Sequence, residues 1–388
     1  MQNGVIQLKK IKNLIKKIIS KFFKIKKIII MESNPDFTDN TKKVYDKLLE
    51  KNVNEKYKIV WFVDDYKKFN HVQTKNVKFI NLNPGKSIIN ILKKTYYLCS
   101  AKIIIDCNKF ISKVKKQQIR IHLCHGTPLK KVDEYNSLIG DVDYILEIGN
   151  YFSNGLAETF KKPKDILLDF GFPRNDDLFA NIEKLNDYKT KLNNKIVVWL
   201  PTYRNHKNKA THGDASLKYG LPCLNSKQDI LKFDRILKDN NVTVFIKLHP
   251  AEDSKILKSF NCKNLKLISD KDLLDNNLNL YQLLSMSDAL ITDYSSVYYD
   301  YLLTKKPIAL AISDIKLYEK NVGFFDDFYK VIKGEYAYNV DDLNKFIVNL
   351  SKGIDNFRDE RLKCLKLYHS HYDDKASERV YEFIKKFL

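Results

Sequence analysis

The chain has 388 residues, of which 44% are hydrophobic, and a formal net charge of +21. This length and hydrophobic content predict two or three folded domains and exclude a disordered chain. The six cysteines contain no Cys-x-x-Cys pair, which argues against a zinc site or a disulfide framework and favours a reducing, cytosolic compartment. The excess positive charge requires an anionic partner, which can be nucleic acid, anionic lipid or a phosphorylated substrate.

Residues 1–26 form a basic amphipathic segment. Between residues 5 and 24 the apolar side chains fall on one side of a helix and the lysines on the other, and nine lysines precede the first acidic residue, Glu32. A helix of this kind lies in the interface of an anionic membrane, where each lysine contributes about 1 kcal/mol. Lysines interrupt every apolar run, so neither a signal peptide nor a membrane span is predicted. The alternative is a surface helix packed on the protein's own domain.

From residue 28 short apolar runs alternate with longer stretches that suit helices, such as residues 41–49. We predict strands in this first half at residues 28–31, 59–63, 77–80, 103–106, 119–124, 144–148 and 166–169. Such alternation predicts a parallel sheet with helices on both faces. We assign this N-terminal domain to residues 27–190.

A polar stretch rich in Asn and Lys, residues 179–195, predicts a domain boundary, after which the alternation starts again. Strands are predicted at residues 197–200, 242–248, 265–268, 289–292 and 307–311, and helices from residue 340 onward. The polar segment 205–225 predicts a surface loop. We assign the C-terminal domain to residues 191–370. The fold class is therefore α/β, with two parallel sheets that face a central cleft.

Two histidines follow predicted strands. The run that ends at residue 124 leads into His125-Gly126-Thr127-Pro128, and the run 242–248 leads into His249-Pro250. Glycine permits a close approach and proline ends the strand, so such a turn can present an imidazole to a ligand. Because parallel sheets bind ligands outside the carboxyl ends of their strands, we expect both imidazoles in one cleft. The alternative is an ordinary turn with an exposed histidine.

The segment Thr292-Asp293-Tyr294-Ser295-Ser296 follows a predicted strand and opens a predicted helix, 297–303. Hydroxyls and amides at a helix N-terminus form a phosphate site. The alternative is a simple helix cap. Asp300, one turn later, reaches the cleft or is solvated on the helix surface.

Arg174, Arg204 and Lys247 each lie at a predicted strand end or in the turn after it, where a cation faces the ligand. The sequence has no Gly-rich dinucleotide fingerprint and no Walker loop, which disfavours redox chemistry with dinucleotides and ordinary nucleotide hydrolysis. Cys124 lies beside His125, but neighbouring residues of a strand point to opposite faces, so we do not predict a thiol nucleophile.

Seven motifs in this order resemble the CDP-glycerol glycerophosphotransferase family of teichoic acid and capsule synthesis, from about residue 28 to the C-terminus. They are His125-Gly126-Thr127-Pro128-Leu129-Lys130, Gly171-Phe172-Pro173-Arg174-Asn175-Asp176, Pro201-Thr202-Tyr203-Arg204, Lys247-Leu248-His249-Pro250, Thr292-Asp293-Tyr294-Ser295-Ser296 with Asp300, Lys306-Pro307-Ile308, and Ala376-Ser377-Glu378-Arg379. The chain departs from the family at Cys124, where an aromatic residue is common.

The resemblance implies a GT-B arrangement of two Rossmann-like domains. It implies that the C-terminal domain holds most of the donor nucleotide and that a final helix, residues 371–388, lies near the region between the domains. The amphipathic start is similar to the monotopic attachment of that family, which implies a peripheral protein on the cytoplasmic face of the cell membrane.

The expected reaction transfers glycerol phosphate, or a related polyol phosphate, from a CDP-linked donor to a hydroxyl of a lipid-linked or polymer acceptor, and releases CMP. His125 is the expected general base, since an imidazole ordinarily has a pKa of about 6.5, and His249 is the second catalytic residue. The expected donor-binding residues are Gly126, Thr127, Arg174, Asn175, Thr202, Arg204, Lys247, Pro250, Thr292, Asp293, Ser295, Ser296 and Asp300. CMP leaves as a phosphate monoester that needs no general acid, and we expect no metal, no cofactor and no nucleic-acid partner.

Two other hypotheses remain. A GT-B glycosyltransferase would transfer a sugar from a nucleotide sugar and would release a different nucleotide. A basic binding module without catalysis would keep its function when His125 is replaced, and its binding to DNA would fall steeply with salt.

Overall fold

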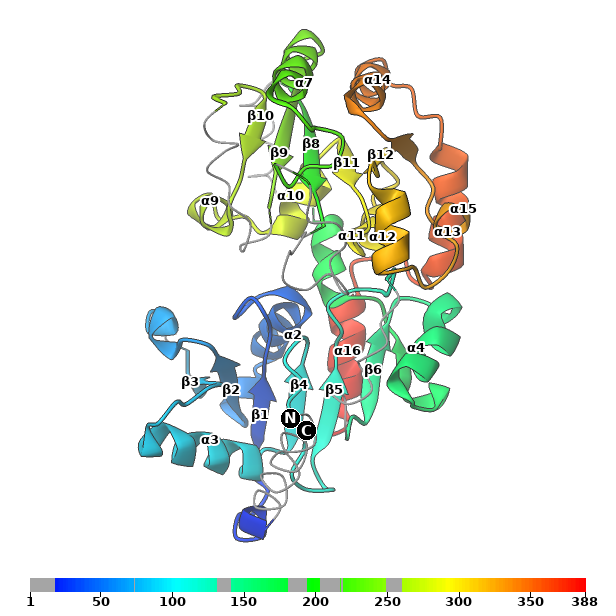
Figure 1. Ribbon diagram of the computed structural model, residues 1–388. Helices are drawn as coiled ribbons and strands as arrows, with labels where there is room; N and C mark the ends of the chain where they lie inside the picture. Colours follow the sequence, from blue (N-terminus) through cyan, green and yellow to red (C-terminus); the bar gives the residue numbers. More distant parts are fainter. Residues whose placement is uncertain are drawn as a thin grey trace. The chain divides into compact units, whose positions relative to one another are not determined.

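The computed structural model describes residues 18–72, 74–130, 141–180, 194–202, 217, 219–248 and 260–388. The chain divides into two compact units. Unit 1 comprises residues 1–125, 133–176 and 375–388, and unit 2 comprises residues 126–132 and 177–374. Each unit has its own sheet with helices packed against it (Figure 1).

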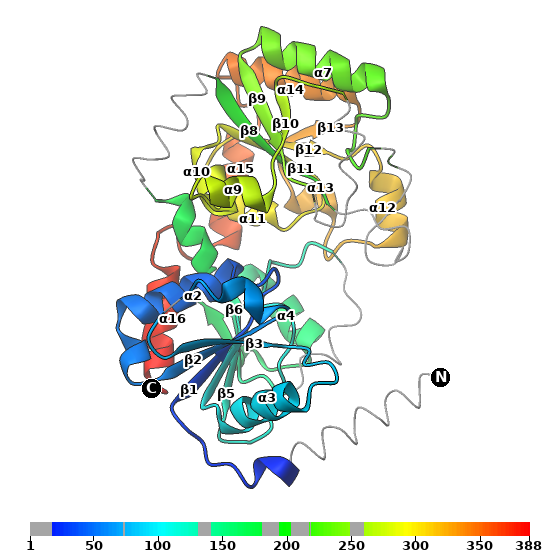
Figure 2. The ribbon, with the colours of Figure 1, turned by 90° about the vertical axis from the view of Figure 1, so that its left-hand side faces the viewer.

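Unit 1 is built on a seven-stranded parallel sheet in the order β3-β2-β1-β4-β5-β6-β7. The strands are β1 (Ile28–Met31), β2 (Lys58–Val63), β3 (Val77–Asn81), β4 (Ile103–Asp106), β5 (Ile119–His122), β6 (Tyr144–Glu147) and β7 (Leu167–Asp169). The helices are α2 (Asp39–Glu50), α3 (Ile88–Ser100), α4 (Ser153–Phe160) and α16 (Ala376–Lys385). Figure 2 shows α2 and α16 on one face of the sheet and α3 and α4 on the other.

The apolar strands of unit 1 are buried on both faces, as the crossover helices require. All four residues of β1 are buried. Neighbouring side chains of β2 point to opposite faces of the sheet. Trp61 packs edge-on against Tyr45 of α2, with ring centroids 5.7 Å apart, whereas Phe62 belongs to the core cluster that contains Leu98 of α3. The alternation of the strand therefore fixes which helix covers which face.

The helix α16 belongs to unit 1 although it lies at the far end of the sequence. Glu378 pairs with Lys47 of α2 and with Lys51 directly after it, with nitrogen–oxygen distances of 3.2 and 3.0 Å. The buried carboxylate of Asp176 accepts hydrogen bonds from the amides of Ala376 and Ser377, both at 2.9 Å, and from the Ser377 hydroxyl. Asp176 therefore caps a helix that begins 200 residues later in the chain.

Unit 2 is built on a six-stranded parallel sheet in the order β10-β9-β8-β11-β12-β13. The strands are β8 (Lys195–Leu200), β9 (Val242–Ile246), β10 (Leu265–Leu267), β11 (Ala289–Thr292), β12 (Ile308–Ala311) and β13 (Glu335–Ala337). The helices are α7 (Lys227–Asp239), α9 (Asp270–Asp275), α10 (Leu280–Met286), α11 (Val297–Leu302), α12 (Ile315–Asn321), α13 (Phe328–Val331), α14 (Val340–Ser351) and α15 (Arg358–Tyr368).

Two strand predictions extend two residues too far, and one strand was missed. The strand predicted at residues 119–124 ends at His122, because Cys124 adopts a left-handed backbone with φ of +53°. The strand predicted at 242–248 ends at Ile246. The strand β13 was not predicted, because its three residues, Glu-Tyr-Ala, show no apolar run. Among the described residues, no helix is both long and apolar enough to cross a membrane.

In both sheets the strand order reverses between two central strands, β1 and β4 in unit 1 and β8 and β11 in unit 2. Ligands of doubly wound sheets bind outside the carboxyl ends of the strands at such a reversal. In unit 1 the candidate site is therefore made by the residues that follow β1, β4 and the neighbouring strand β5. In unit 2 it is made by the residues that follow β8 and β11.

Candidate functional site

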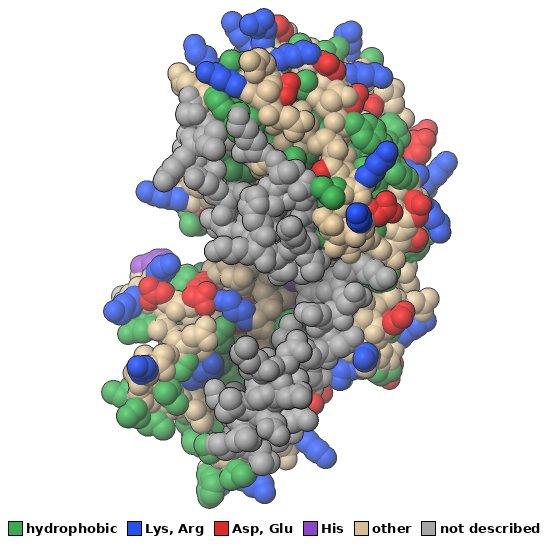
Figure 3. Space-filling view, viewed as in Figure 1, with side chains coloured by type: hydrophobic (Ala, Val, Ile, Leu, Met, Phe, Trp, Pro, Cys, Tyr) green, Lys and Arg blue, Asp and Glu red, His purple; other side chains and the backbone are tan. Residues whose placement is uncertain are grey.

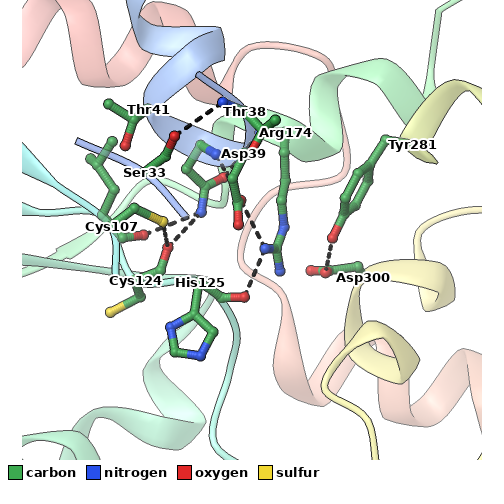
Figure 4. Close-up of polar contacts among 12 residues, drawn as sticks. Ser33, Thr38, Asp39, Thr41, Cys107, Cys124, His125, Arg174, Tyr281 and Asp300 are labelled. Atoms are coloured by element: carbon green, nitrogen blue, oxygen red, sulfur yellow. Dashed lines mark hydrogen bonds and ion pairs between the residues drawn. The ribbon is translucent and has the colours of Figure 1, made fainter. Parts of the chain in front are cut away.

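His125 lies at the carboxyl end of β5 with an exposed side chain (Figure 4). The left-handed backbone of Cys124 turns the chain out of the strand just before it. Asn40, fully buried at the start of α2, holds this turn: its side-chain nitrogen donates to the carbonyls of Leu123 at 3.3 Å and Cys124 at 2.8 Å. The unusual backbone is thus stabilised from outside the loop.

Arg174 fixes the carbonyl of His125 from the other side. Its Nη1 donates to that oxygen at 2.7 Å and lies 2.9 Å from the carboxylate of Asp39, while its amide donates to the side-chain oxygen of Asn40 at 3.1 Å. Arg174 was predicted to bind the donor phosphates. In the structure its guanidinium positions the loop that carries His125, and donor binding by Arg174 stays a prediction.

We expect Asn40→Ala to lower kcat about 10- to 100-fold, because a catalytic group displaced by about an ångström loses much of its effect. The free energy of unfolding should fall by about 2 kcal/mol, because buried carbonyls lose their donor. The matched control is Asn54→Ala, which removes another buried asparagine of unit 1, whose side chain donates to the carbonyl of Lys75 at 3.1 Å. Steady-state kinetics and urea unfolding of both variants measure the two effects. An equal loss of kcat in the control would contradict a positioning role for Asn40.

Glu32 bridges the two central loops of unit 1. It follows β1, is fully buried, and one carboxylate oxygen accepts the amides of Cys107, Asn108 and Lys109 after β4, at 3.3, 3.2 and 2.9 Å. Burial raises the pKa of Glu32 to about 7, against the lowering effect of these three amides. The carboxyl of Glu32 therefore ties together the loops on either side of the reversal in strand order.

The raised pKa of Glu32 predicts a pH-dependent stability. The folded protein binds this proton more tightly than the unfolded chain, so the stabilisation is full below the ordinary value of 4.5 and is lost as the pH rises through about 7. We expect the unfolding free energy of the wild type, relative to Glu32→Gln, to fall by about 3 kcal/mol between these two pH values. Urea unfolding of both proteins across this range measures the difference.

The exposed Glu158 offers a baseline, since Glu158→Gln removes one carboxylate without touching the central loops. If the difference in unfolding free energy between the wild type and Glu32→Gln stayed constant across this pH range, the prediction would be contradicted.

In unit 2 the corresponding bridge is made by Asp293, which follows β11 and is fully buried. Its carboxylate accepts the amide of Thr202 after β8, at 2.9 and 3.0 Å, the Thr202 hydroxyl at 2.5 Å, and the amide of Tyr294 at 2.6 Å. Thr292 donates its hydroxyl to the carbonyl of Leu200 at 2.9 Å. These three predicted donor-binding residues hold the two central loops of the sheet in place.

Ser295 and Ser296 lie where α11 begins. Ser296 occupies the cap position and makes no side-chain capping hydrogen bond, so the simple cap considered above does not describe it. The Ser295 hydroxyl accepts the amide of Val297 at 3.4 Å. Because α11 has only six residues, local amides and hydroxyls would contribute more to anion binding there than a helix dipole.

Asp300 is buried, 1% exposed, and accepts a hydrogen bond from the hydroxyl of Tyr281 at 2.7 Å (Figure 4). It is therefore not solvated on a helix surface. Lys247 pairs with Asp270 at 3.0 Å. Both residues lie in unit 2, which also holds the Ser295–Ser296 segment.

The other predicted site residues lie in unit 1, in unit 2 or outside the described residues. Gly126 and the buried Thr127 belong to unit 2. Their segment, residues 126–132, is held there by the carbonyl of Leu129, which accepts the amide of Phe325, and by a β-bridge between Lys130 and Phe324. Asn175 is buried in unit 1 beside Arg174. Arg204, His249 and Pro250 lie outside the described residues.

Burial raises the pKa of the Cys124 thiol, which agrees with the expectation that it is no nucleophile. Among the described residues, no group of three or more His, Cys, Asp or Glu side chains is arranged to hold a metal ion. Two Asp-x-Asp pairs occur, at residues 141–143 and 270–272. Asp143 accepts hydrogen bonds from Lys113 and the amide of Arg120, and Asp272 accepts hydrogen bonds from Ser269 at the start of α9.

Comparison with known proteins finds a matching family model and several relatives of this chain. A family model described as CDP-glycerol:poly(glycerophosphate) glycerophosphotransferase matches residues 14–386. A teichoic acid glycerol-phosphate primase of Bacillus subtilis is 26% identical over 327 residues, which covers 78% of each chain. A teichoic acid glycerol-phosphate transferase of Staphylococcus aureus is 25% identical and covers 97% of this chain and 100% of its own length.

The chain is also similar to a solved structure of the wall teichoic acid polymerase TagF, a histidine-to-asparagine variant soaked with CDPG. The TM-score is 0.74 at 22% identity, with 98% of this chain and 96% of that chain covered. At this identity the likeness shows the fold alone. It confirms the predicted GT-B-like fold, with two α/β units on parallel sheets.

Proposed function

This chain belongs to the CDP-glycerol:poly(glycerophosphate) glycerophosphotransferase family, and from that premise we propose that it transfers glycerol phosphate from CDP-glycerol to a hydroxyl of a membrane-associated acceptor. The chain is a transferase that moves a polyol phosphate from a CDP-linked donor, as the family match over residues 14–386 shows. That match is the observation that carries the proposal. Glycerol is the proposed polyol because both relatives described above act on glycerol phosphate.

The proposed reaction breaks the bond between the two phosphates of the donor. The acceptor hydroxyl attacks the phosphorus that carries glycerol, His125 takes the hydroxyl proton, and CMP leaves with the bridging oxygen. An exposed imidazole at the end of β5, on a loop held by Asn40 and Arg174, supports this role, since positioning before reaction is what a general base requires. CMP leaves as a phosphate monoester with a second pKa of about 6, so no protonation is needed.

We propose that unit 2 binds the nucleotide part of the donor. Support comes from the reversal in strand order between β8 and β11 and from the hydroxyls of Ser295 and Ser296 beside it. His249, Arg204 and Lys247 are proposed to bind the diphosphate from the same unit. Asp293 and Thr202 are proposed to hold the loops that form this site.

We also propose that the protein acts on the cytoplasmic face of the cell membrane. Residues 1–26 support this proposal through their amphipathic pattern and their eight lysines. A lipid-linked or polymer acceptor would then be within reach of the enzyme.

A donor assay tests the proposed function. The purified protein is incubated with a glycerol-phosphate-primed lipid acceptor and, separately, with CDP-glycerol, CDP-ribitol or a UDP-sugar, and the released nucleotide is separated by chromatography. We expect CMP from CDP-glycerol and incorporation of labelled glycerol into the acceptor. UDP release from the sugar donor would reject the proposal in favour of a glycosyltransferase, and CMP release from CDP-ribitol alone would reject the polyol.

A further inference from the structure

The first two turns of α3 carry aliphatic side chains that folding does not bury. Ile88, Ile89, Ile91 and Leu92, named here the α3 face, are 72%, 64%, 41% and 63% exposed. The side chain of Ser87 accepts the amide of Asn90 at 3.4 Å, so the helix is formed from Ile88 onward. Residues three and four apart lie on one side of a helix, which places Ile91 and Leu92 beside Ile88. The α3 face is therefore a continuous apolar stripe.

The other end of α3 is buried in the core of unit 1. Tyr97, Leu98 and Cys99 belong to the core cluster that also contains Phe62. The helix is thus anchored by its last turn while its first turns project from the unit (Figure 1). An anchored helix can hold the α3 face in a fixed orientation toward a partner.

A second exposed apolar element packs beside α3. Ile18 is 50% and Phe22 is 83% exposed. The residue that follows, Phe23, contacts the ring of Tyr96 of α3 edge-on, with centroids 6.0 Å apart, and Lys26 donates to the Tyr96 hydroxyl at 3.0 Å. Figures 1 and 2 both show this segment and α3 at the end of unit 1 where β1 begins. Figure 3 shows hydrophobic side chains exposed over this end of the unit.

Along the sequence, the chain on both sides of these apolar residues is basic. Residues 66–105 contain no Asp or Glu and hold eight lysines: Lys67, Lys68, Lys75, Lys78, Lys86, Lys93, Lys94 and Lys102. The segment before Glu32 adds nine lysines, again without an acidic residue. Lys86, which is exposed, lies two residues before α3, and Lys93 and Lys94 lie on α3 directly after Leu92. Apolar side chains flanked by lysines in this way match an anionic lipid surface, which accepts the apolar groups into its interface and attracts the lysines. In a symmetric pair of copies the same lysines would face each other and repel.

We propose that the α3 face, together with Ile18 and Phe22, inserts into the headgroup region of an anionic membrane. Membrane contact then involves a folded helix of unit 1 in addition to residues 1–17. This inference goes beyond the proposed reaction and does not depend on it, because vesicle binding is measured without donor or acceptor.

The test is flotation of the full chain with vesicles of phosphatidylglycerol and phosphatidylcholine. We expect Ile88→Glu with Leu92→Glu to lower the partition coefficient at least about tenfold, since two aliphatic side chains lose their burial and two like charges enter the interface. Ile88→Trp with Leu92→Trp should retain binding, because Trp is favoured at the membrane interface. The matched control is Leu274→Glu with Leu367→Glu, two leucines of unit 2 that are 71% and 53% exposed, and it should leave partition unchanged.

Three results would overturn the proposal. The first is an unchanged partition coefficient in the glutamate variant. The second is a change of oligomeric state by light scattering without loss of vesicle binding, which would make the α3 face an interface between copies. The third concerns a chain that lacks residues 1–17. If this chain no longer binds vesicles while the full-length glutamate variant still binds, all membrane contact would lie in the deleted segment. Turnover with a water-soluble acceptor should be normal in the glutamate variant, which separates this result from any failure of the proposed reaction.

Discussion

Replacing His125 by alanine is expected to lower kcat for CMP release about 10²- to 10⁴-fold, the usual contribution of a general base. The KM for the donor should change little, because His125 is proposed to act on the acceptor hydroxyl and the nucleotide is proposed to bind in unit 2. The exposed position of the imidazole means that its removal leaves no cavity, so the free energy of unfolding should remain within about 0.5 kcal/mol of the wild type.

The control for this variant is His71→Ala, which removes another exposed histidine of unit 1. Steady-state kinetics with CDP-glycerol should show full activity for the control. A reduction of kcat by less than tenfold in His125→Ala would argue against general base catalysis by this residue. A reduction of the same size in both variants would point to a general effect of histidine replacement on the unit.

The second large effect is expected for Asp176→Ala. This buried carboxylate accepts two amides and one hydroxyl at the start of α16, and the residue in the local cap position, Lys375, makes no side-chain capping bond. Loss of the cap should lower the free energy of unfolding by about 2–4 kcal/mol, because buried donors lose a charged acceptor. Urea unfolding measures the total, and hydrogen exchange should show faster exchange in residues 376–385.

The control is Asp359→Ala, which removes an exposed acidic residue from the first turn of α15, a helix without a side-chain cap. Its effect should stay below about 0.5 kcal/mol. Equal losses in the two variants would show that charge near a helix start, and not the specific cap, accounts for the result. Unchanged exchange in residues 376–385 of Asp176→Ala would contradict the assigned contact.

Most strands could be predicted because they are short, apolar and buried on both faces, as in Ile28–Met31 and Ala289–Thr292. The exceptions have local causes. The strand end before His125 was placed two residues too late, because nothing in the run Ile-His-Leu-Cys indicates the positive φ of Cys124. The strand Glu335–Ala337 is too short and polar to stand out.

The candidate site was only partly predictable for a different reason. His125 could be found from its place after an apolar run. Asn40 could not, because at the start of a helix it resembles an ordinary cap, and its bonds to Leu123 and Cys124 join residues more than 80 positions apart. Glu32 offered a signal, since it is a carboxylate directly after a buried strand, but its partners lie more than 70 positions away and the sequence does not reveal them.

The cap between Asp176 and α16 illustrates the same limit. The motifs that contain Asp176 and Ser377 are both visible in the sequence, yet local patterns do not reveal that one binds the other. Only the folded chain brings them together, with hydrogen bonds of 2.9 Å across about half the sequence. The pairing is a property of tertiary structure.

The membership of α16 in unit 1 also affects how the protein is made. Most of unit 1 is translated before residues 177–374 of unit 2, but one face of its sheet stays incomplete until residues 376–385 have been translated. The hydrophobic surface that Val380 and Ile384 cover would meanwhile be available to chaperones. Unit 2, whose residues form one nearly continuous segment, can finish folding before the unit that was begun first.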